Sequence, residues 1–183
     1  MRTPRVHGSG PRACGHLRPV TAALALAALS ACGAPAFDGT VYRGEDLAFR
    51  IPPAPPGWER LAVSDAAVAY RDKAHGATIA VNGRCQGEDD VPLVALTKHL
   101  FLTFTDQEVL KQEVVPFDGR EAMHTVLSAK LDGVPKRFDV WVLKKNGCVY
   151  DLLFIADPGR FDAGAPAFER MVRGFATLPA HDE

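Results

Sequence analysis

The sequence is short of several features that mark familiar classes of protein. Its 183 residues carry 21 basic and 22 acidic side chains, so there is no positive excess of the kind that binds nucleic acid. Four cysteines are too few for a small disulfide-dense scaffold. The apolar run Val20–Leu29 is about ten residues long, whereas a membrane-spanning helix needs about 20, and no later run is longer. These shortages argue against a nucleic-acid binder, a disulfide scaffold and an integral membrane protein.

Motifs of common enzymes and metal proteins are also missing. There is no Cys-x-x-Cys pair, no Gly-x-Ser-x-Gly turn and no glycine-rich phosphate loop. The histidines beyond the N-terminal segment do not pair at ligand spacing, and each is expected to be a surface residue: His75, His99, His124 and His181. Ser128 lies four strand residues from His124, about 13 Å, too far for proton transfer. We therefore expect no enzyme and no metal site.

The N-terminal segment is typical of a secretory signal. Met1–Arg18 carries four arginines and no acidic residue, and the apolar segment Val20–Leu29 follows it. The segment ends in Leu29-Ser30-Ala31-Cys32, which resembles the lipobox of bacterial lipoproteins. In that family the cysteine thiol takes a diacylglycerol group, a peptidase cuts before the cysteine, and the new amino group usually receives a further acyl chain such as palmitate.

The lipobox resemblance implies that residues 1–31 are removed and that the acyl lipid on Cys32 is the one non-protein group. Two or more acyl chains anchor a protein stably, whereas one is marginal. Gly33 stands where an Asp often retains such proteins in the inner membrane, which favours the outer membrane and a domain facing the periplasm. The alternative is an ordinary signal peptide cut near Ala31, which would leave a soluble secreted protein.

Removal of the signal changes the charge of the working protein. Taking its four arginines from the 21 basic residues leaves 17 against 22 acidic ones, a net charge of -5. A mildly acidic domain gives no reason to expect electrostatic binding to a membrane. Its attachment is expected to come from the lipid on Cys32.

The rest of the chain is predicted to be one α+β domain over residues 39–179, between a tether at 32–38 and a frayed tail at 180–183. Alternating apolar residues predict strands at 39–43, 47–51, 58–62, 66–71 and 77–84. A helix is predicted over Val91–Thr105, because apolar residues recur there at helical spacing: Leu93, Leu96, Leu100, Phe101 and Phe104.

Four more strands are predicted at 108–115, 121–131, 136–144 and 148–156. The turn sequences Asp118-Gly119, Asp132-Gly133 and Asn146-Gly147 separate them and favour tight antiparallel hairpins. Arg120, beside the first turn, is a candidate for binding an anion. A final helix is predicted from an apolar stripe and ends at Pro179; the stripe is Phe168, Met171, Val172 and Phe175. Together, these predicted strands and helices indicate an antiparallel sheet of six or more strands with two main helices packed on it.

This order of elements resembles the small PsbP-like domains. Three features carry the resemblance: strand 47–51 runs into Pro52 and Gly57-Trp58, the strand with Tyr150–Phe154 precedes the last helix, and that helix closes with Phe168, Val172 and Phe175. The chain departs from the family at Pro53–Pro56, which lengthen the first bend, and at Gly174, where a Ser is common. The resemblance implies a fold and no functional residues, because domains of that fold do different things.

Two cysteines remain for the domain, since Cys14 leaves with the signal and Cys32 carries the lipid. Export would put Cys85 and Cys148 in an oxidising compartment, so we predict a disulfide between them. Cys85 ends one predicted strand and Cys148 begins another, so the bond would join two neighbouring strands or a strand and the entry to the helix. Two buried thiols or a reactive pair are the alternatives.

Two functions follow as expectations. The first is a non-catalytic lipoprotein whose domain binds a protein partner in the envelope, with no role for nucleic acid. The second is a carrier of a small molecule or lipid in an apolar pocket between sheet and helices. Phe101, Phe104, Trp141 and Phe154 would line that pocket, although core packing also accounts for them.

Overall fold

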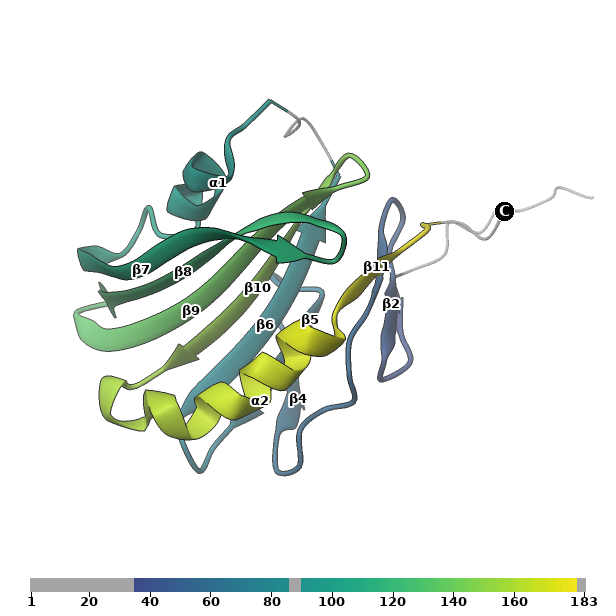
Figure 1. Ribbon diagram of the computed structural model, residues 1–183. Coiled ribbons are helices and arrows are strands. Elements are labelled where there is room, and N and C mark those ends of the chain that lie inside the picture. The colour runs from purple at the N-terminus through teal and green to yellow at the C-terminus, as the bar shows by residue number, and fades with distance from the viewer. Residues whose placement is uncertain (1–34, 86–89, 181–183) are drawn as a thin grey trace, which may run out of the picture. The chain divides into compact units, whose positions relative to one another are not determined.

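The computed structural model describes residues 35–85 and 90–180. The predicted signal peptide, Cys32 and residues 181–183 lie outside the described residues. Two antiparallel sheets and two helices make up the described part (Figure 1), which confirms the α+β class. In this part of the chain no helix is both long and apolar enough to cross a membrane.

The large sheet has seven strands in the order β4-β5-β6-β10-β9-β8-β7. They are β4 (Glu59–Leu61), β5 (Val68–Asp72), β6 (Ala77–Arg84), β7 (Thr105–Phe117), β8 (Arg120–Leu131), β9 (Val134–Lys145) and β10 (Cys148–Ala156). The predicted bounds of β6 and β10 are confirmed, and the other five strands are found within one to three residues of their predicted ends. All neighbouring strands are antiparallel, as the tight turns predict.

The three hairpins from β7 to β10 turn at the predicted dipeptides. Asp118, Asp132 and Asn146 have φ values of 47°, 50° and 54°, and the glycine after each also has positive φ. Two successive residues with positive φ make the turn whose twist matches that of paired strands. The residue types at these three positions were therefore enough to predict the turns.

The small sheet has the order β1-β2-β3-β11. Its strands are β1 (Ala36–Phe37), β2 (Val41–Arg43), β3 (Ala48–Arg50) and β11 (Ala176–Leu178). The prediction that the last helix continues to Pro179 is wrong: α2 (Phe161–Gly174) ends earlier, and Ala176–Leu178 pairs with β3. Phe175 adopts an extended backbone and its ring is buried, so the chain leaves the helix to join the sheet.

The first helix is also shorter than predicted. α1 spans only Leu93–His99, and the chain continues through tight turns to Phe104. Phe101 and Phe104 are three residues apart, so their spacing imitates a helix although they lie in these turns. Gln107 donates side-chain hydrogen bonds to the backbone oxygens of Phe101 and Phe104, at 2.8 and 3.0 Å, which satisfies the carbonyls that a continuing helix would have paired.

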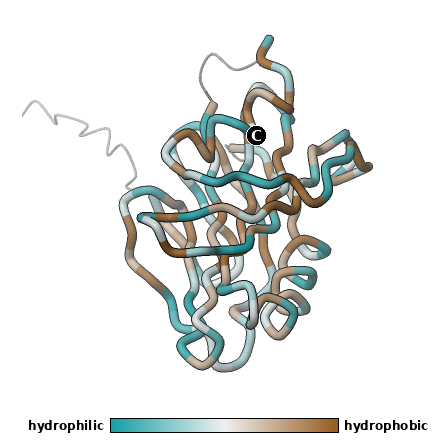
Figure 2. Tube along the Cα trace, turned by 90° about the vertical axis from the view of Figure 1, so that its left-hand side faces the viewer, coloured by the Kyte–Doolittle hydropathy of each residue, from teal (hydrophilic) through white to brown (hydrophobic). Residues whose placement is uncertain are grey.

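The large sheet is covered on both faces, and Figure 2 shows apolar and polar residues alternating along its strands. One face packs against α2 and the small sheet around buried residues that include Phe49, Ile79, Tyr150, Leu152, Phe154 and Phe168. The other packs against α1 around Leu96, Phe101, Leu127, Phe138 and Val140. The short 3-10 helix η1 (Pro158–Arg160) leads from β10 into α2. α2 crosses the first face obliquely and leaves part of β8 and β9 beside it (Figure 1).

Candidate functional site

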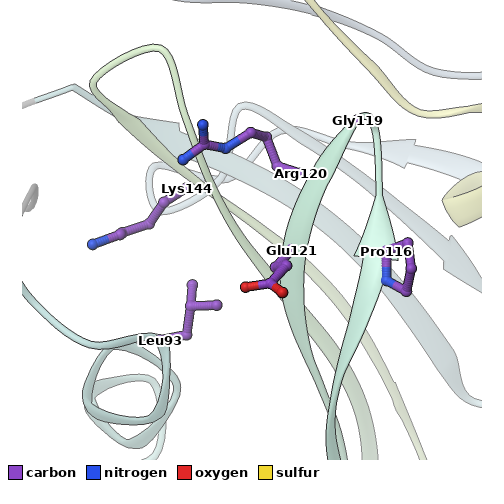
Figure 3. Close-up of a pocket in the computed structure, with 6 residues that line it drawn as sticks. All are labelled: Leu93, Pro116, Gly119, Arg120, Glu121 and Lys144. Atoms are coloured by element: carbon purple, nitrogen blue, oxygen red, sulfur yellow. The ribbon is translucent and has the colours of Figure 1, made fainter.

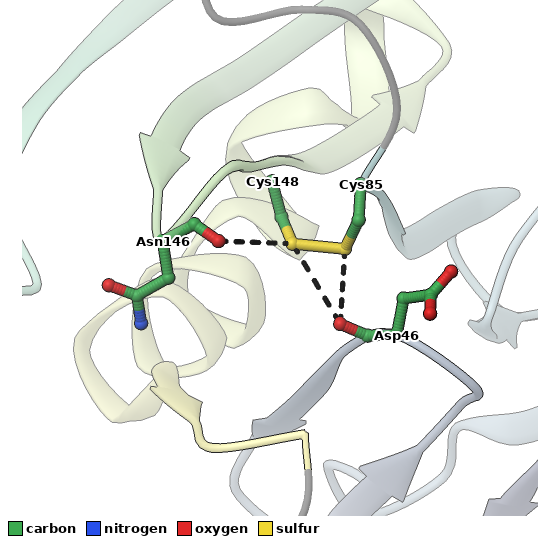
Figure 4. Close-up of a disulfide and its surroundings, with 4 residues drawn as sticks. All are labelled: Asp46, Cys85, Asn146 and Cys148. Carbon is green, nitrogen blue, oxygen red and sulfur yellow. Dashed lines mark hydrogen bonds between the residues drawn. A yellow bond between two sulfur atoms is a disulfide. The ribbon is translucent and has the colours of Figure 1, made fainter.

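The predicted disulfide between Cys85 and Cys148 is present, with an S–S bond of 2.12 Å (Figure 4). It joins the end of β6 to the start of β10, which pair side by side, so the neighbouring-strand arrangement is the one formed. The backbone oxygen of Asp46 lies 3.3 Å from Cys85 Sγ and 4.0 Å from Cys148 Sγ. Since bonded sulfurs carry no proton, these are close contacts. The bond therefore lies within the large sheet, and the loop between β2 and β3 packs against it through Asp46.

A hollow of about 550 Å³ lies between the start of α1 and the β7–β8 hairpin (Figure 3). Its lining consists of Leu93, Pro116, Gly119, Arg120, Glu121 and Lys144. Arg120, the predicted anion-binding candidate, shares this space with the carboxylate of Glu121. Lys144 Nζ donates to the backbone oxygen of Val91 at 2.9 Å. Charges of both signs meet here, so the lining does not select an anion.

A second hollow, of about 370 Å³, lies beside the disulfide. It is lined by Pro35, Tyr42, Gly44, Glu45, Asp46, Leu47, Gly83, Arg84 and Cys85. Gly83 leaves room for Leu47, because a Cβ at Gly83 would lie 2.9 Å from a methyl carbon of Leu47. Because Pro35 is part of this lining, the hollow borders the first described residue of the tether.

The strongest candidate site is a third hollow, of about 300 Å³, between the large sheet and α2. We call it the α2 groove, and it is lined by His124 of β8, Asp139 and Trp141 of β9, and Phe168, Glu169, Val172 and Arg173 of α2. The strand residues share one face because side chains alternate along a strand. The helix residues lie three and four positions apart, which puts them on one side of α2.

His124 and Trp141 form the floor of the α2 groove. They lie directly opposite each other on β8 and β9, and their rings stack with centroids 4.4 Å apart and an interplanar angle of 19°. The His124 side chain is only 12% exposed, so the prediction that it is a surface residue is wrong. The sequence could not reveal that His124 is buried, because the neighbouring strand and α2 are what cover its side chain.

Carboxylates approach both ring nitrogens of His124. Nε2 lies 3.0 Å from Asp139 Oδ1, and Nδ1 lies 3.7 Å from Glu113 Oε1. Glu113 also accepts a hydrogen bond from Lys111 Nζ at 2.7 Å, and this bond, with a smaller contribution from His124, lowers the pKa of Glu113. A row of polar side chains therefore runs across β7, β8 and β9 to the edge of the groove: Lys111, Glu113, His124 and Asp139.

The other histidines do not contribute to this site. His75 is half exposed, and its Nδ1 lies 2.5 Å from Asp72 Oδ2 in the turn between β5 and β6. The hydrogen bond from His75 has the largest effect on the pKa of Asp72 and lowers it, and burial of the carboxylate offsets only part of this. His99 is exposed at the end of α1, and His181 lies outside the described residues. No cluster of three metal-binding side chains occurs among residues 35–85 and 90–180.

The four aromatic residues predicted to line one pocket do not meet. Phe101 and Phe104 pack on Phe138 in the core beneath α1, with centroids 5.2 Å from it in both cases. Phe154 is fully buried on the opposite face of the sheet, against Phe161 and Phe168. Trp141 lines the third hollow, between the large sheet and α2.

The α2 groove combines an apolar wall with a charged rim. Trp141, Phe168 and Val172 provide an apolar wall, and Glu169 and Arg173 form an ion pair at its rim, with Nη1 and Oε2 3.4 Å apart and side chains 61% and 65% exposed. None of the seven lining residues has a hydroxyl or thiol group. The polar groups that the lining offers are the imidazole of His124, the carboxylates of Asp139 and Glu169, the indole N–H of Trp141 and the guanidinium of Arg173.

No known family profile matches this chain, and no curated protein sequence does. Several solved structures are similar to it. LpqN, involved in cell envelope biogenesis of Mycobacterium tuberculosis, has a TM-score of 0.54 at 14% identity, over 72% of this chain and 83% of its own. The cyanobacterial PsbP protein CyanoP of Synechocystis has a TM-score of 0.53 at 15% identity, over 82% of this chain and 99% of its own.

A third structure, from Bacteroides thetaiotaomicron, has a TM-score of 0.51 at 10% identity, and the match covers 78% of this chain and 49% of that one. Identities this low establish a shared fold and carry no residue roles. The resemblance to PsbP-like domains, first drawn from core positions, is confirmed at the level of the fold. The described domain thus has a PsbP-like fold, which a protein of cell envelope biogenesis shares.

Proposed function

We propose that the protein is a bacterial envelope lipoprotein, anchored through acyl lipid on Cys32, whose domain binds a protein partner without catalysing a reaction. The lipobox supports the anchor, and Gly33 after the cysteine supports the outer membrane and a domain facing the periplasm. The α2 groove is the observation that carries the binding role. Its apolar wall with a charged, exposed rim is the usual composition of a protein interface.

The free edge of the large sheet is a weaker candidate for partner binding. β7 has two irregularities in its pairing with β8, before Glu108 and before Lys111. It also carries Lys111 and Pro116. Bulges, lysine and proline on an edge strand all oppose the addition of another strand. The partner is therefore assigned to the groove and not to the edge of β7.

The anchor is tested by Cys32→Ser. The unmodified protein should fractionate with membranes and take up labelled palmitate, because acyl chains hold it there. The Cys32→Ser variant should either leave the membrane fraction or remain as an unprocessed precursor. Unchanged fractionation and unchanged electrophoretic mobility would refute the lipid anchor.

The binding role is tested by crosslinking in intact cells. A photoreactive amino acid in place of Arg173 should capture the same envelope protein in repeated experiments. The same amino acid in place of Lys73, whose side chain is 69% exposed in the turn after β5, is the matched control and should not capture it. Recovery of the protein alone from both positions would sink the partner hypothesis.

A charge exchange on the rim separates binding from folding. Glu169→Arg with Arg173→Glu keeps an ion pair four residues apart on α2 but reverses its direction. We expect a melting temperature that falls only slightly, because the reversed order of charges is less favourable by a few tenths of a kcal/mol, and at least a several-fold loss of captured partner. Since both side chains are mostly exposed, equal capture by this variant would show that the rim does not contact the partner.

A small-molecule carrier is the second candidate, and the volume of the α2 groove favours it. About 300 Å³ is at the lower limit of pockets that hold small molecules. A ligand should then remain bound to the protein in native mass spectrometry, and Trp141→Ala should release it. A bare protein mass in preparations that still capture the partner would reject this candidate.

A further inference from the structure

The tether to the predicted lipid site is very short. Three peptide bonds join Cys32 to Pro35, so their Cα atoms lie within about 11 Å of each other in any conformation of the chain between them. Pro35 lines the hollow beside the disulfide, together with Tyr42, Asp46 and Cys85. A lipid on Cys32 would therefore keep this end of the domain close to the membrane surface.

The opposite end of the domain is far from the tether. β9 has 12 residues and runs from Val134 to Lys145, which pairs with Cys148 of the disulfide. At about 3.3 Å per residue the two ends of β9 are separated by about 36 Å. Figure 1 shows β9 running from its turn with β8, on the left, to its turn with β10, near the small sheet.

We infer that the domain has a fixed orientation on the bilayer, with its disulfide end toward the lipid and its hairpin end away from it. The disulfide end comprises residues 44–47, 83–85 and 146–148, and the hairpin end comprises residues 72–76 and 132–134. This inference rests on the lipid anchor proposed above. Glu45 and Asp46 are exposed at the disulfide end, so the anchor and not charge attraction to an anionic surface holds it there.

The orientation also bears on the partner. Trp141 in the α2 groove lies four residues from Lys145 along β9, or about 13 Å, and seven residues from Val134, or about 23 Å. The groove is therefore closer to the membrane end of the domain than to its far end. A partner that is itself bound to the membrane fits this position.

Paramagnetic relaxation tests the orientation without any substitution. Mature lipidated protein, labelled with ¹⁵N, is placed in phosphatidylcholine nanodiscs that contain a lipid with a gadolinium chelate on its headgroup. Relaxation enhancement falls with the sixth power of distance. Backbone amides of the disulfide end should therefore relax at least about tenfold faster than those of the hairpin end, given the separation of about 36 Å.

Two variants control this measurement. Ten glycine and serine residues inserted between Gly33 and Ala34 should even out the relaxation of the two ends, because a flexible linker no longer restricts orientation. Cys32→Ser protein mixed with the same nanodiscs should show no enhancement at either end. Equal enhancement at both ends, in protein whose mass includes the lipid, would overturn the orientation. A purified mature protein without lipid on Cys32 would instead overturn the anchor, and the orientation with it.

Discussion

Asp118 and Thr177 lie 59 residues apart in the sequence and are joined by two hydrogen bonds. Asp118 Oδ2 accepts from the backbone nitrogen of Thr177 at 3.0 Å and from its hydroxyl at 2.7 Å. Lys145 Nζ donates a third hydrogen bond to Asp118 Oδ2, at 2.9 Å, and also donates to the backbone oxygen of Asp118. One carboxylate in the β7–β8 turn thus connects β9 of the large sheet with β11 of the small sheet.

Replacing this carboxylate should loosen the contact between the sheets. Asp118→Asn preserves a residue type that tolerates the φ of 47° but removes the charge. Hydrogen bonds to a charged group stabilise by about 1.5–3 kcal/mol, so we expect the free energy of unfolding to fall by about 1–2 kcal/mol. Urea denaturation measures it. Thr177→Val, which removes only the hydroxyl, should cost less, and an equal or larger loss would contradict the central role of the carboxylate.

The same carboxylate predicts a dependence of stability on pH. Burial raises the pKa of Asp118, but hydrogen bonds from Thr177 and Lys145 outweigh it, so the pKa is lowered overall. Its stabilisation is therefore complete above the unfolded value of about 3.9 and is lost as the pH falls through the lower folded value. The difference in unfolding free energy between wild type and Asp118→Asn should be constant from about pH 5 to 7 and shrink below about pH 4. A difference that stays undiminished at about pH 2 would rule this out.

Loss of the disulfide should destabilise the domain strongly. The bond closes 63 residues, for which the chain-entropy relation gives about 4 kcal/mol, with measured losses of about 2–5 kcal/mol for native bonds. Replacing both Cys85 and Cys148 by alanine should therefore lower the urea midpoint clearly. Wild type under reducing conditions is the control and should lose a similar amount. Denaturation curves that coincide with and without the bond would show that it adds no stability.

Gly174 is expected to tolerate no side chain. A Cβ there would lie 2.3 Å from Cγ of Pro52, so Gly174→Ala must displace the bend after β3. Overpacking of this kind costs about 1–3 kcal/mol, against a gain of up to about 1 kcal/mol from the higher helix propensity of alanine. Thermal unfolding should show a lower midpoint. Gly159→Ala, at a position with no atom within 4 Å of the added carbon, is the control and should be nearly neutral.

The contact of Gly174 with Pro52 joins residues more than a hundred positions apart. Glycine is required at position 174 because Pro52 lies against it. No local pattern in the sequence records this contact.

What the sequence determined by itself is local in origin. Asp-Gly and Asn-Gly steps set three hairpin turns because their residues accept positive φ, and the predicted bounds of β6 and β10 are confirmed to the residue. Two cysteines at predicted strand ends, together with the expected export, were enough to predict a disulfide, but not to decide between two neighbouring strands and a strand with the helix entry. The run Leu29–Cys32, which resembles a lipobox, is likewise local, and the proposed lipid anchor rests on it alone.

What only the tertiary structure decided depends on partners distant in sequence. β11 exists because β3 offers it backbone hydrogen bonds, and this pairing outweighs a helical stripe that continues through Phe175. The α2 groove exists because strand register puts His124 opposite Trp141 and α2 then covers one side of them. Burial, ring stacking and ion pairing depend on which distant residues the strand pairing brings together. Local sequence patterns therefore do not predict them.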